Sequence, residues 1–249
     1  MRSGAALALS LAALAWAPLA LGQRIPIPPH PKAPLFGNLL IDRTTSGGPV
    51  KPASFSHWSH RLRYTCRVCH LELEFALKRN GTEITEEANR KGRFCGACHD
   101  GNTAFGRDEA SCGRCHTGDV ETGKAGFSKL KGLPAAKFGN GVDWSAALAS
   151  GKIAPVASLV EGLQPMSLET TLTLPAELAG IPPAVFPHAI HARWLDCANC
   201  HPDVFNIRKK TTKHFSMGAI LQGQFCGACH LSVAFPLDDC KRCHPAMKG

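Results

Sequence analysis

The chain has 249 residues, of which twelve are cysteine and twelve histidine, whereas only 7% are aromatic. Its 24 glycines and 18 prolines dilute the aliphatic side chains, so this composition excludes a conventional apolar core made by the polypeptide alone. After residue 22 no run approaches the roughly 18 apolar residues that a bilayer span requires, which also excludes a stable membrane span.

Residues 1–22 have the pattern of a secretory signal peptide. Arg2 gives a positively charged start, residues 5–20 are an apolar run, and small residues at positions 20 and 22 suit a signal peptidase. We therefore expect an exported protein, periplasmic or extracellular, with an uncleaved anchor as the alternative.

Residues 23–54 are rich in proline and have no sustained helical or strand period, which predicts an extended N-terminal arm. His30 is the only histidine in this arm. Its surroundings of polar residues and proline predict an exposed side chain.

All twelve cysteines belong to six Cys-x-x-Cys-His units. Two thiols at this spacing can add to the two vinyl groups of one haem, and the adjoining histidine then lies beneath the iron as an axial ligand. Zinc sites and disulfides are the alternatives, but zinc needs converging pairs, and disulfides leave the six histidines unexplained. The pattern predicts six covalently bound haem c groups, each with its iron. The attachment cysteines are Cys66, Cys69, Cys95, Cys98, Cys112, Cys115, Cys197, Cys200, Cys226, Cys229, Cys240 and Cys243, and the adjoining histidines are His70, His99, His116, His201, His230 and His244.

The two halves of the chain repeat each other. Phe55, with the histidines and cysteines that follow it as far as His99, has counterparts at a constant offset of 131 residues, and the third unit of each half matches at 128. Such self-similarity indicates duplicated domains. We expect a trihaem domain at residues 55–116, a haem-free spacer at 117–185 and a second trihaem domain at 186–249.

Each repeat begins with two histidines three residues apart. On a helix this spacing places both imidazoles on one face, where they can serve two different haems. The pairs are His57 with His60 and His188 with His191.

Three local elements are also predicted. Asn80-Gly81 indicates a turn, and the Glu-rich residues 83–87 indicate the capped start of a short helix. Residues 142–149 form a third element, a helix with Asp143 in its first turn and Gly151 near its end. The spacer also contains four apolar side chains that we expect to be shielded from solvent, those of Trp144, Leu148, Ile153 and Val156.

The fold expected is therefore one with little regular secondary structure, in which short α-helices and long loops wrap around covalently bound haems. Six haems also bring about 12 propionate charges, which offset the formal charge of +9. We therefore do not expect a nucleic-acid partner.

With Phe-x-His-x-x-His before the first unit and Cys-Gly-Ala-Cys-His as the second, the chain resembles two copies of the small trihaem cytochromes of the c-three/c-seven superfamily. The resemblance covers residues 55–116 and 186–244. It implies the distal and proximal ligand pairs His188 with His201, His191 with His230, His214 with His244, His57 with His70, and His60 with His99.

The resemblance fails at one position. The counterpart of His214 is Glu83, so the haem at His116 lacks a sixth ligand. His30 could complete it, as could Met166, or the iron could stay open to water or a small ligand.

The expected function is one-electron transfer, without catalysis, between a membrane quinol-linked donor and a terminal reductase or outer-membrane conduit. Two alternatives stay open. If the haem iron at His116 has an open coordination position, the protein could be a reductase of small substrates. Glu83, Glu86 and Arg114 would then be the nominal acid and cationic groups. Self-association into a polymer would let a histidine of one chain complete the haem of another.

Overall fold

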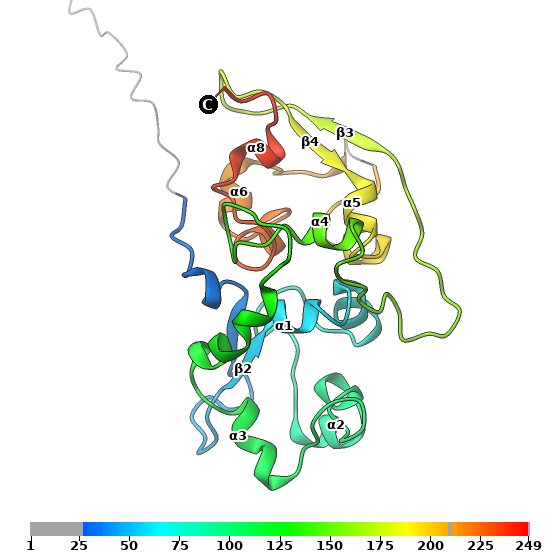
Figure 1. Ribbon diagram of the computed structural model, residues 1–249. Coiled ribbons are helices and arrows are strands. Elements are labelled where there is room, and N and C mark those ends of the chain that lie inside the picture. The colour runs from blue at the N-terminus through cyan, green and yellow to red at the C-terminus, as the bar shows by residue number, and fades with distance from the viewer. Residues whose placement is uncertain (1–26, 209–210, 249) are drawn as a thin grey trace, which may run out of the picture.

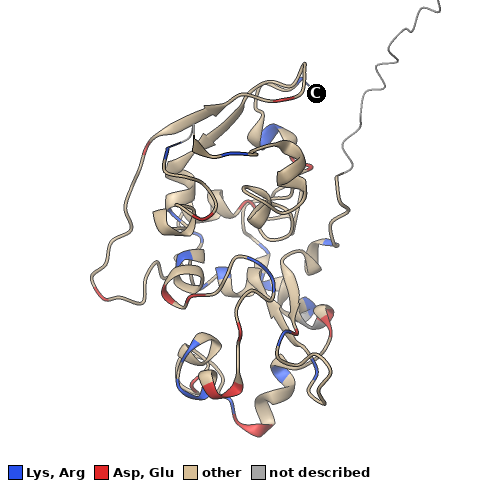
Figure 2. Ribbon diagram, turned by 180° about the vertical axis from the view of Figure 1, so that it is seen from behind, with Lys and Arg blue, Asp and Glu red and all other residues tan. Residues whose placement is uncertain are grey.

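The computed structural model describes residues 27–208 and 211–248, so the predicted signal peptide at residues 1–22 lies outside the described residues. The chain forms two lobes (Figure 1). The first repeat and the segment before it form one lobe, the second repeat and the strand pair that leads into it form the other, and the rest of the intervening segment runs between them. Both ribbon views show this arrangement (Figures 1 and 2).

Each lobe contains a strand pair that leads into the helix carrying the two histidines. In the first lobe, β1 (Asn38–Ile41) pairs antiparallel with β2 (Ala53–Ser56), which runs directly into α1 (His57–Arg61). In the second lobe, β3 (Thr171–Leu174) pairs with β4 (Ala184–Pro187), followed by α5 (His188–Ala192). The bounds of β4 and α5 equal those of β2 and α1 shifted by 131 residues, so the sequence repeat is also a structural repeat.

The strands β1 and β3 differ from the sequence-based expectation. The strand β1 lies in the segment expected to be an extended arm, and β3 lies in the spacer, for which only a helix was predicted. Each gains its hydrogen bonds from a strand that runs into the adjoining repeat, and such a pairing leaves little local signal in the sequence.

The remaining elements are short. Most occupy a Cys-x-x-Cys-His unit or the turn before it. They are η1 (Ala33–Leu35), η2 (Val68–Glu72), α2 (Glu86–Arg90), η3 (Phe94–Ala97), η4 (Glu109–Ser111), α3 (Cys112–Cys115), η5 (Val120–Leu130), α4 (Trp144–Ala149), η6 (Cys197–Asn199), α6 (Met217–Leu221), α7 (Gly227–His230) and α8 (Cys240–Cys243).

Side-chain caps fix where several of these helices begin. Thr85 accepts a hydrogen bond from the Ala88 N–H at the start of α2, and Asp143 accepts one from the Ala146 N–H at the start of α4. The predicted helix at residues 142–149 and the predicted capped helix at the Glu-rich segment are therefore confirmed. The predicted turn is present too, with Gly81 N–H donating to the Lys78 carbonyl.

The apolar core lies where the two lobes meet. One cluster contains Trp58, Leu130 and Val142, and a second contains Ile153 and Trp194 with residues of α4. Spacer residues thus cover the junction, although Val156 stays 46% exposed.

Short helices, long loops and two two-stranded sheets make up the described residues, as predicted for a multihaem fold. Lys, Arg, Asp and Glu are spread over both lobes in the view of Figure 2. No helix within the described ranges is both long and apolar enough to cross a bilayer.

Candidate haem-binding sites

The Cys-x-x-Cys-His units form single helical turns. In five of the six, the N–H of the histidine donates to the carbonyl of the first cysteine four residues earlier, as in His116 to Cys112 at 3.0 Å. This turn brings both thiols and the imidazole of a unit together. None of the twelve cysteines forms a disulfide.

Burial favours the protonated form of several thiols in these units. It raises the pKa of Cys69, Cys226 and Cys229 to about 12 in each case, and the nearby cysteines add to the effect. A thioether bond to haem carries no charge, so a buried site favours it over a thiolate ligand to a metal ion.

Apart from His30, whose Nδ1 bonds to the carbonyl of its neighbour Pro31, ten histidine rings are oriented by a hydrogen bond from Nδ1 to a backbone carbonyl oxygen. Such a bond fixes the tautomer and leaves Nε2 as the metal-binding atom. Within the described residues none of these ten Nε2 atoms has a hydrogen-bond partner. The acceptors are the carbonyls of Gly37 for His57, Ser56 for His60, Phe75 for His70, Phe105 for His99, Lys51 for His116, Thr170 for His188, Pro187 for His191, Phe205 for His201, Phe235 for His230 and Pro182 for His244, at 2.7–3.1 Å.

Two of these acceptors lie next to the strands that local sequence did not predict. The Gly37 carbonyl, just before β1, accepts from both the backbone N–H and the Nδ1 of His57 at 2.9 Å. The Thr170 carbonyl, just before β3, does the same for His188. The strand pairs therefore position the first histidine of each repeat.

Three pairs of imidazoles lie next to each other with their ring centres at the separation that one iron requires. Iron lies about 2 Å from each ligating nitrogen, and each ring centre lies about 1 Å farther out, so the two centres should be about 6 Å apart. The measured separations are 6.4 Å for His57 and His70, 6.3 Å for His60 and His99, and 6.2 Å for His191 and His230. The residues present thus fit a haem iron between the rings of each pair.

Burial favours the neutral form of five of these rings. Burial lowers the pKa of His57 to about 3, outweighing its hydrogen bond to Gly37, and lowers that of His230 to about 4 in the same way. The same cause lowers the pKa values of His60, His70 and His191. A neutral imidazole is the form that binds a metal ion.

Two other expected pairs are not in ring contact in the described part of the chain. His188 and His201 both have an anchored Nδ1. His214 is exposed, with a φ of 59°, and has no Nδ1 anchor there, whereas its expected partner His244 does. These two ligand pairs stay predictions.

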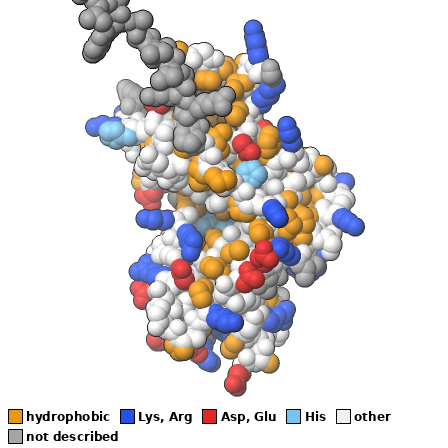
Figure 3. All heavy atoms as spheres, turned by 90° about the vertical axis from the view of Figure 1, so that its left-hand side faces the viewer, with side chains coloured by type: hydrophobic (Ala, Val, Ile, Leu, Met, Phe, Trp, Pro, Cys, Tyr) orange, Lys and Arg blue, Asp and Glu red, His pale blue; other side chains and the backbone are white. Residues whose placement is uncertain are grey.

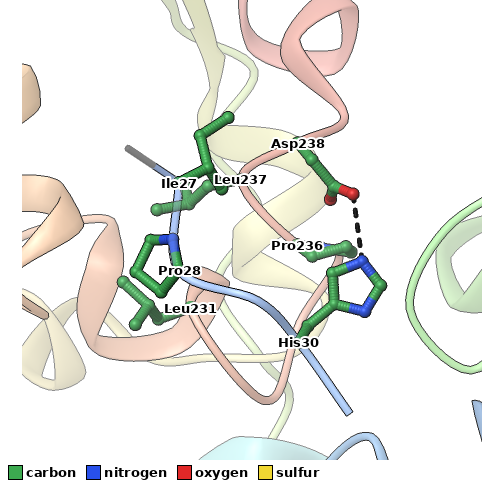
Figure 4. Close-up of a pocket in the computed structure, with 7 residues that line it drawn as sticks. All are labelled: Ile27, Pro28, His30, Leu231, Pro236, Leu237 and Asp238. Carbon is green, nitrogen blue, oxygen red and sulfur yellow. Dashed lines mark hydrogen bonds and ion pairs between the residues drawn. The ribbon is translucent and has the colours of Figure 1, made fainter. Parts of the chain in front are cut away.

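His30 does not approach His116. Its Nε2 lies 3.0 Å from Asp238 Oδ2, and the ring lies next to Pro236 in a small pocket that Ile27 and Pro28 also line (Figure 4). Asp238 leads into α8 of the second lobe, whereas α3, which precedes His116, lies at the opposite end of the molecule (Figure 1). The structure thus corrects the expectation that His30 completes the His116 site. The second alternative, Met166, is 67% exposed.

Sequence reasoning missed Arg61 as well as the carbonyl acceptors. Arg61 is a buried cation at the junction of the lobes, and nothing in its local sequence distinguishes it from the exposed Arg63. The sequence motif Cys-Gly-Ala-Cys-His does not indicate why its second residue is glycine. In both repeats a Cβ there would overlap a backbone carbonyl oxygen, that of Asn89 at Gly96 and that of Ile220 at Gly227.

Paired, Nδ1-anchored histidines beside Cys-x-x-Cys-His turns define a multihaem c-type cytochrome. A family model described as "Cytochrome c7 and related cytochrome c" matches residues 53–117 and 184–245, about half of the chain. The chain belongs to this family, and covalently bound haem c is its cofactor.

Solved structures similar to the chain include two hexahaem fragments of the protein GSU1996. The C-terminal fragment is 28% identical, with 84% of this chain and 96% of that chain covered and a TM-score of 0.27. The N-terminal fragment is 26% identical, with 85% and 99% covered and a TM-score of 0.27. The dodecahaem cytochrome c itself is 24% identical, with 85% and 75% covered and a TM-score of 0.29. No curated protein matches the chain.

Proposed function

We propose that the protein is a hexahaem cytochrome that carries electrons one at a time, in the periplasm or outside the cell, between a membrane donor and a terminal acceptor. The observation that carries this proposal is the set of three imidazole pairs whose ring centres lie 6.2–6.4 Å apart. Haem with two imidazole ligands supplies one-electron exchange and leaves no coordination position for a substrate. The chain's residues hold and orient these ligands.

The proposal includes two trihaem domains, at residues 55–116 and 186–249. The N-terminal arm at 23–54 and the spacer at 117–185 carry no attachment site. The constant offset of 131 residues and the two separate family matches support this division. The signal-peptide pattern supports export, and redox proteins at the membrane and at the acceptor are the partners proposed.

Mass spectrometry of the protein made with the haem-attachment machinery tests the haem count. We expect six haems in the intact mass and one on each of the six peptides that contain a Cys-x-x-Cys-His unit. A smaller number would contradict the hexahaem assignment, and the peptide masses would show which unit is empty.

Electron paramagnetic resonance of the oxidised protein, with and without cyanide or nitrite, tests the ligands. An electron carrier with six closed irons gives a purely low-spin spectrum that these additions leave unchanged. A high-spin fraction near one sixth that shifts on addition would instead indicate an open iron at His116 and favour a reductase.

The groups that a reductase would need near His116 have other partners. Glu83 pairs with Arg43 at 3.4 Å and Glu86 with Arg90 at 2.6 Å. The guanidinium of Arg114 lies 3.6 Å from the ring centre of Phe105. These contacts support the electron carrier over the reductase.

A further inference from the structure

Arg61, the last residue of α1, is buried at the junction between the two lobes. Only 9% of it is exposed. Its guanidinium donates to the Val233 carbonyl of the second lobe at 3.0 Å. It also lies 5.0 Å from the ring centre of Trp144 in the spacer and 6.0 Å from that of Trp194 in the second lobe. One side chain therefore contacts both the second lobe and the spacer.

The charge of Arg61 has no carboxylate partner among residues 27–208 and 211–248. Arg67 provides the contrast, since it is equally buried but pairs with Glu72 and Asp196. A guanidinium has five N–H donors and stays protonated in proteins, so Arg61 is a positive charge with little compensation. Such a charge acts strongly on its surroundings because the interior has a low dielectric constant.

Two haem-attachment units from different lobes lie beside this charge. Cys66 packs against the apolar cluster that contains Trp194 and Trp144. The N–H of Val233, whose carbonyl binds Arg61, donates to the Cys229 carbonyl at 3.0 Å. Both attachment units therefore adjoin residues that Arg61 contacts directly.

Building on the proposed function, we propose that Arg61 raises the reduction potentials of the haems attached at Cys66–Cys69 and Cys226–Cys229, one in each lobe. A reduced haem carries one positive charge fewer than an oxidised one, so a nearby buried cation stabilises the reduced form. The positive charge of Arg61 thus stabilises the reduced form of one haem on each side of the junction between the trihaem domains.

The test compares haem-resolved reduction potentials, measured by following assigned haem methyl resonances during a redox titration. Arg61→Gln and Arg61→Leu remove the charge, and Leu cannot bind iron. Arg61→Lys keeps the charge, and Arg63→Gln removes an exposed charge two residues away. In both neutral variants we expect the equilibrium constant for reducing the two junction haems to fall about tenfold, or 59 mV for one electron.

Under this proposal Arg61→Lys and Arg63→Gln keep the wild-type potentials. Unchanged potentials in the neutral variants, an equal shift of all six haems, or a shift in Arg61→Lys as large as in Arg61→Gln would overturn it. Failure of both neutral variants to load haem would assign Arg61 a purely structural role and also overturn it. Peptide masses of the wild type show whether both junction units carry haem. An empty junction unit would mean that the proposed function fails, whereas the results above concern Arg61 alone.

Discussion

Eleven of the twelve histidines make the same interaction, a hydrogen bond from Nδ1 to a backbone carbonyl oxygen. This bond decides at the residue scale which ring atom can bind iron, and burial lowers the pKa of five of the paired rings. His30 differs because its Nε2 contacts Asp238. An acceptor next to Nε2 therefore distinguishes a histidine that is not available to iron from the histidines that are.

Replacing His191 by methionine should raise the reduction potential of one haem. Its ring lies 6.2 Å from that of His230, so the change converts a His/His pair to His/Met, which has a higher potential. A redox titration followed by visible absorption measures the effect. His30→Met is the matched control and should leave the titration unchanged. If His191→Met does not alter the titration, His191 is not a ligand.

At the scale of elements, a short helix packs closely against the second attachment unit in each repeat. In the first repeat α2 (Glu86–Arg90) runs so close to η3 (Phe94–Ala97) that a Cβ at Gly96 would overlap the Asn89 carbonyl oxygen. In the second repeat α6 (Met217–Leu221) approaches Gly227 of α7 in the same way. The glycine of Cys-Gly-Ala-Cys-His thus allows the helix to pack on its haem-attachment turn.

Gly96→Ala should therefore destabilise the protein by at least about 2 kcal/mol, because backbone atoms must move to admit the methyl group. Gly113→Ala, at the same position of another Cys-Gly unit, meets nothing within 4 Å. That control should be neutral or more stable by about 0.5–1 kcal/mol, since alanine favours a helix over glycine. Denaturant unfolding measures both, and equal losses would contradict the explanation.

The helix α4 (Trp144–Ala149) of the spacer is attached to α8 through its own cap. Asp143 accepts from the Ala146 N–H and pairs with Arg242 at 3.1 Å. Burial acts to raise the pKa of Asp143, but these two interactions outweigh it and leave the pKa below its usual value. A carboxyl with a lowered pKa in the folded state stabilises the fold above the unfolded-state pKa, and the effect is lost as the pH falls through the lower folded value.

Asp143→Asn should cost at most about 1 kcal/mol at neutral pH, because asparagine keeps the cap and loses only the ion pair. Asp143→Ala should cost about 1 kcal/mol more. Thermal unfolding at neutral pH and at about pH 2 checks the sign, since the difference between wild type and Asp143→Asn should vanish in acid. A difference that persists in acid would exclude the ion pair as its cause.

At the scale of the whole molecule, the polypeptide contributes little core of its own. Its apolar clusters lie at the junction of the lobes, while the repeats are loops around paired histidines. Hydrophobic side chains stay exposed between charged ones on the face shown in Figure 3, and Ile207 is 81% exposed. Haem is the apolar material that would complete such lobes.

We therefore expect that the chain made without haem attachment lacks a cooperative unfolding transition. Too little apolar surface would be buried to offset the conformational entropy of loops this long. Circular dichroism during heating, with the haem-loaded protein as the reference, measures this difference. A cooperative transition in the haem-free chain would show that the polypeptide forms a sufficient core by itself.

The sequence alone determined the features that depend on residues close together in the chain. The six Cys-x-x-Cys-His units, the paired histidines on α1 and α5, the capped start of α4 and the duplication all follow from local spacing. Haem attachment and helix capping act over a few residues, so their signals are short and specific.

Only the tertiary structure decided which groups complete the sites. The carbonyls of Lys51 and Pro182, which orient His116 and His244, lie more than 60 residues away from these rings in the chain. The carbonyl that holds Arg61 comes from residue 233, and Asp238 engages His30 from the other lobe. These partners are backbone atoms or ordinary charges without a motif, so only folding brings them to the sites they complete.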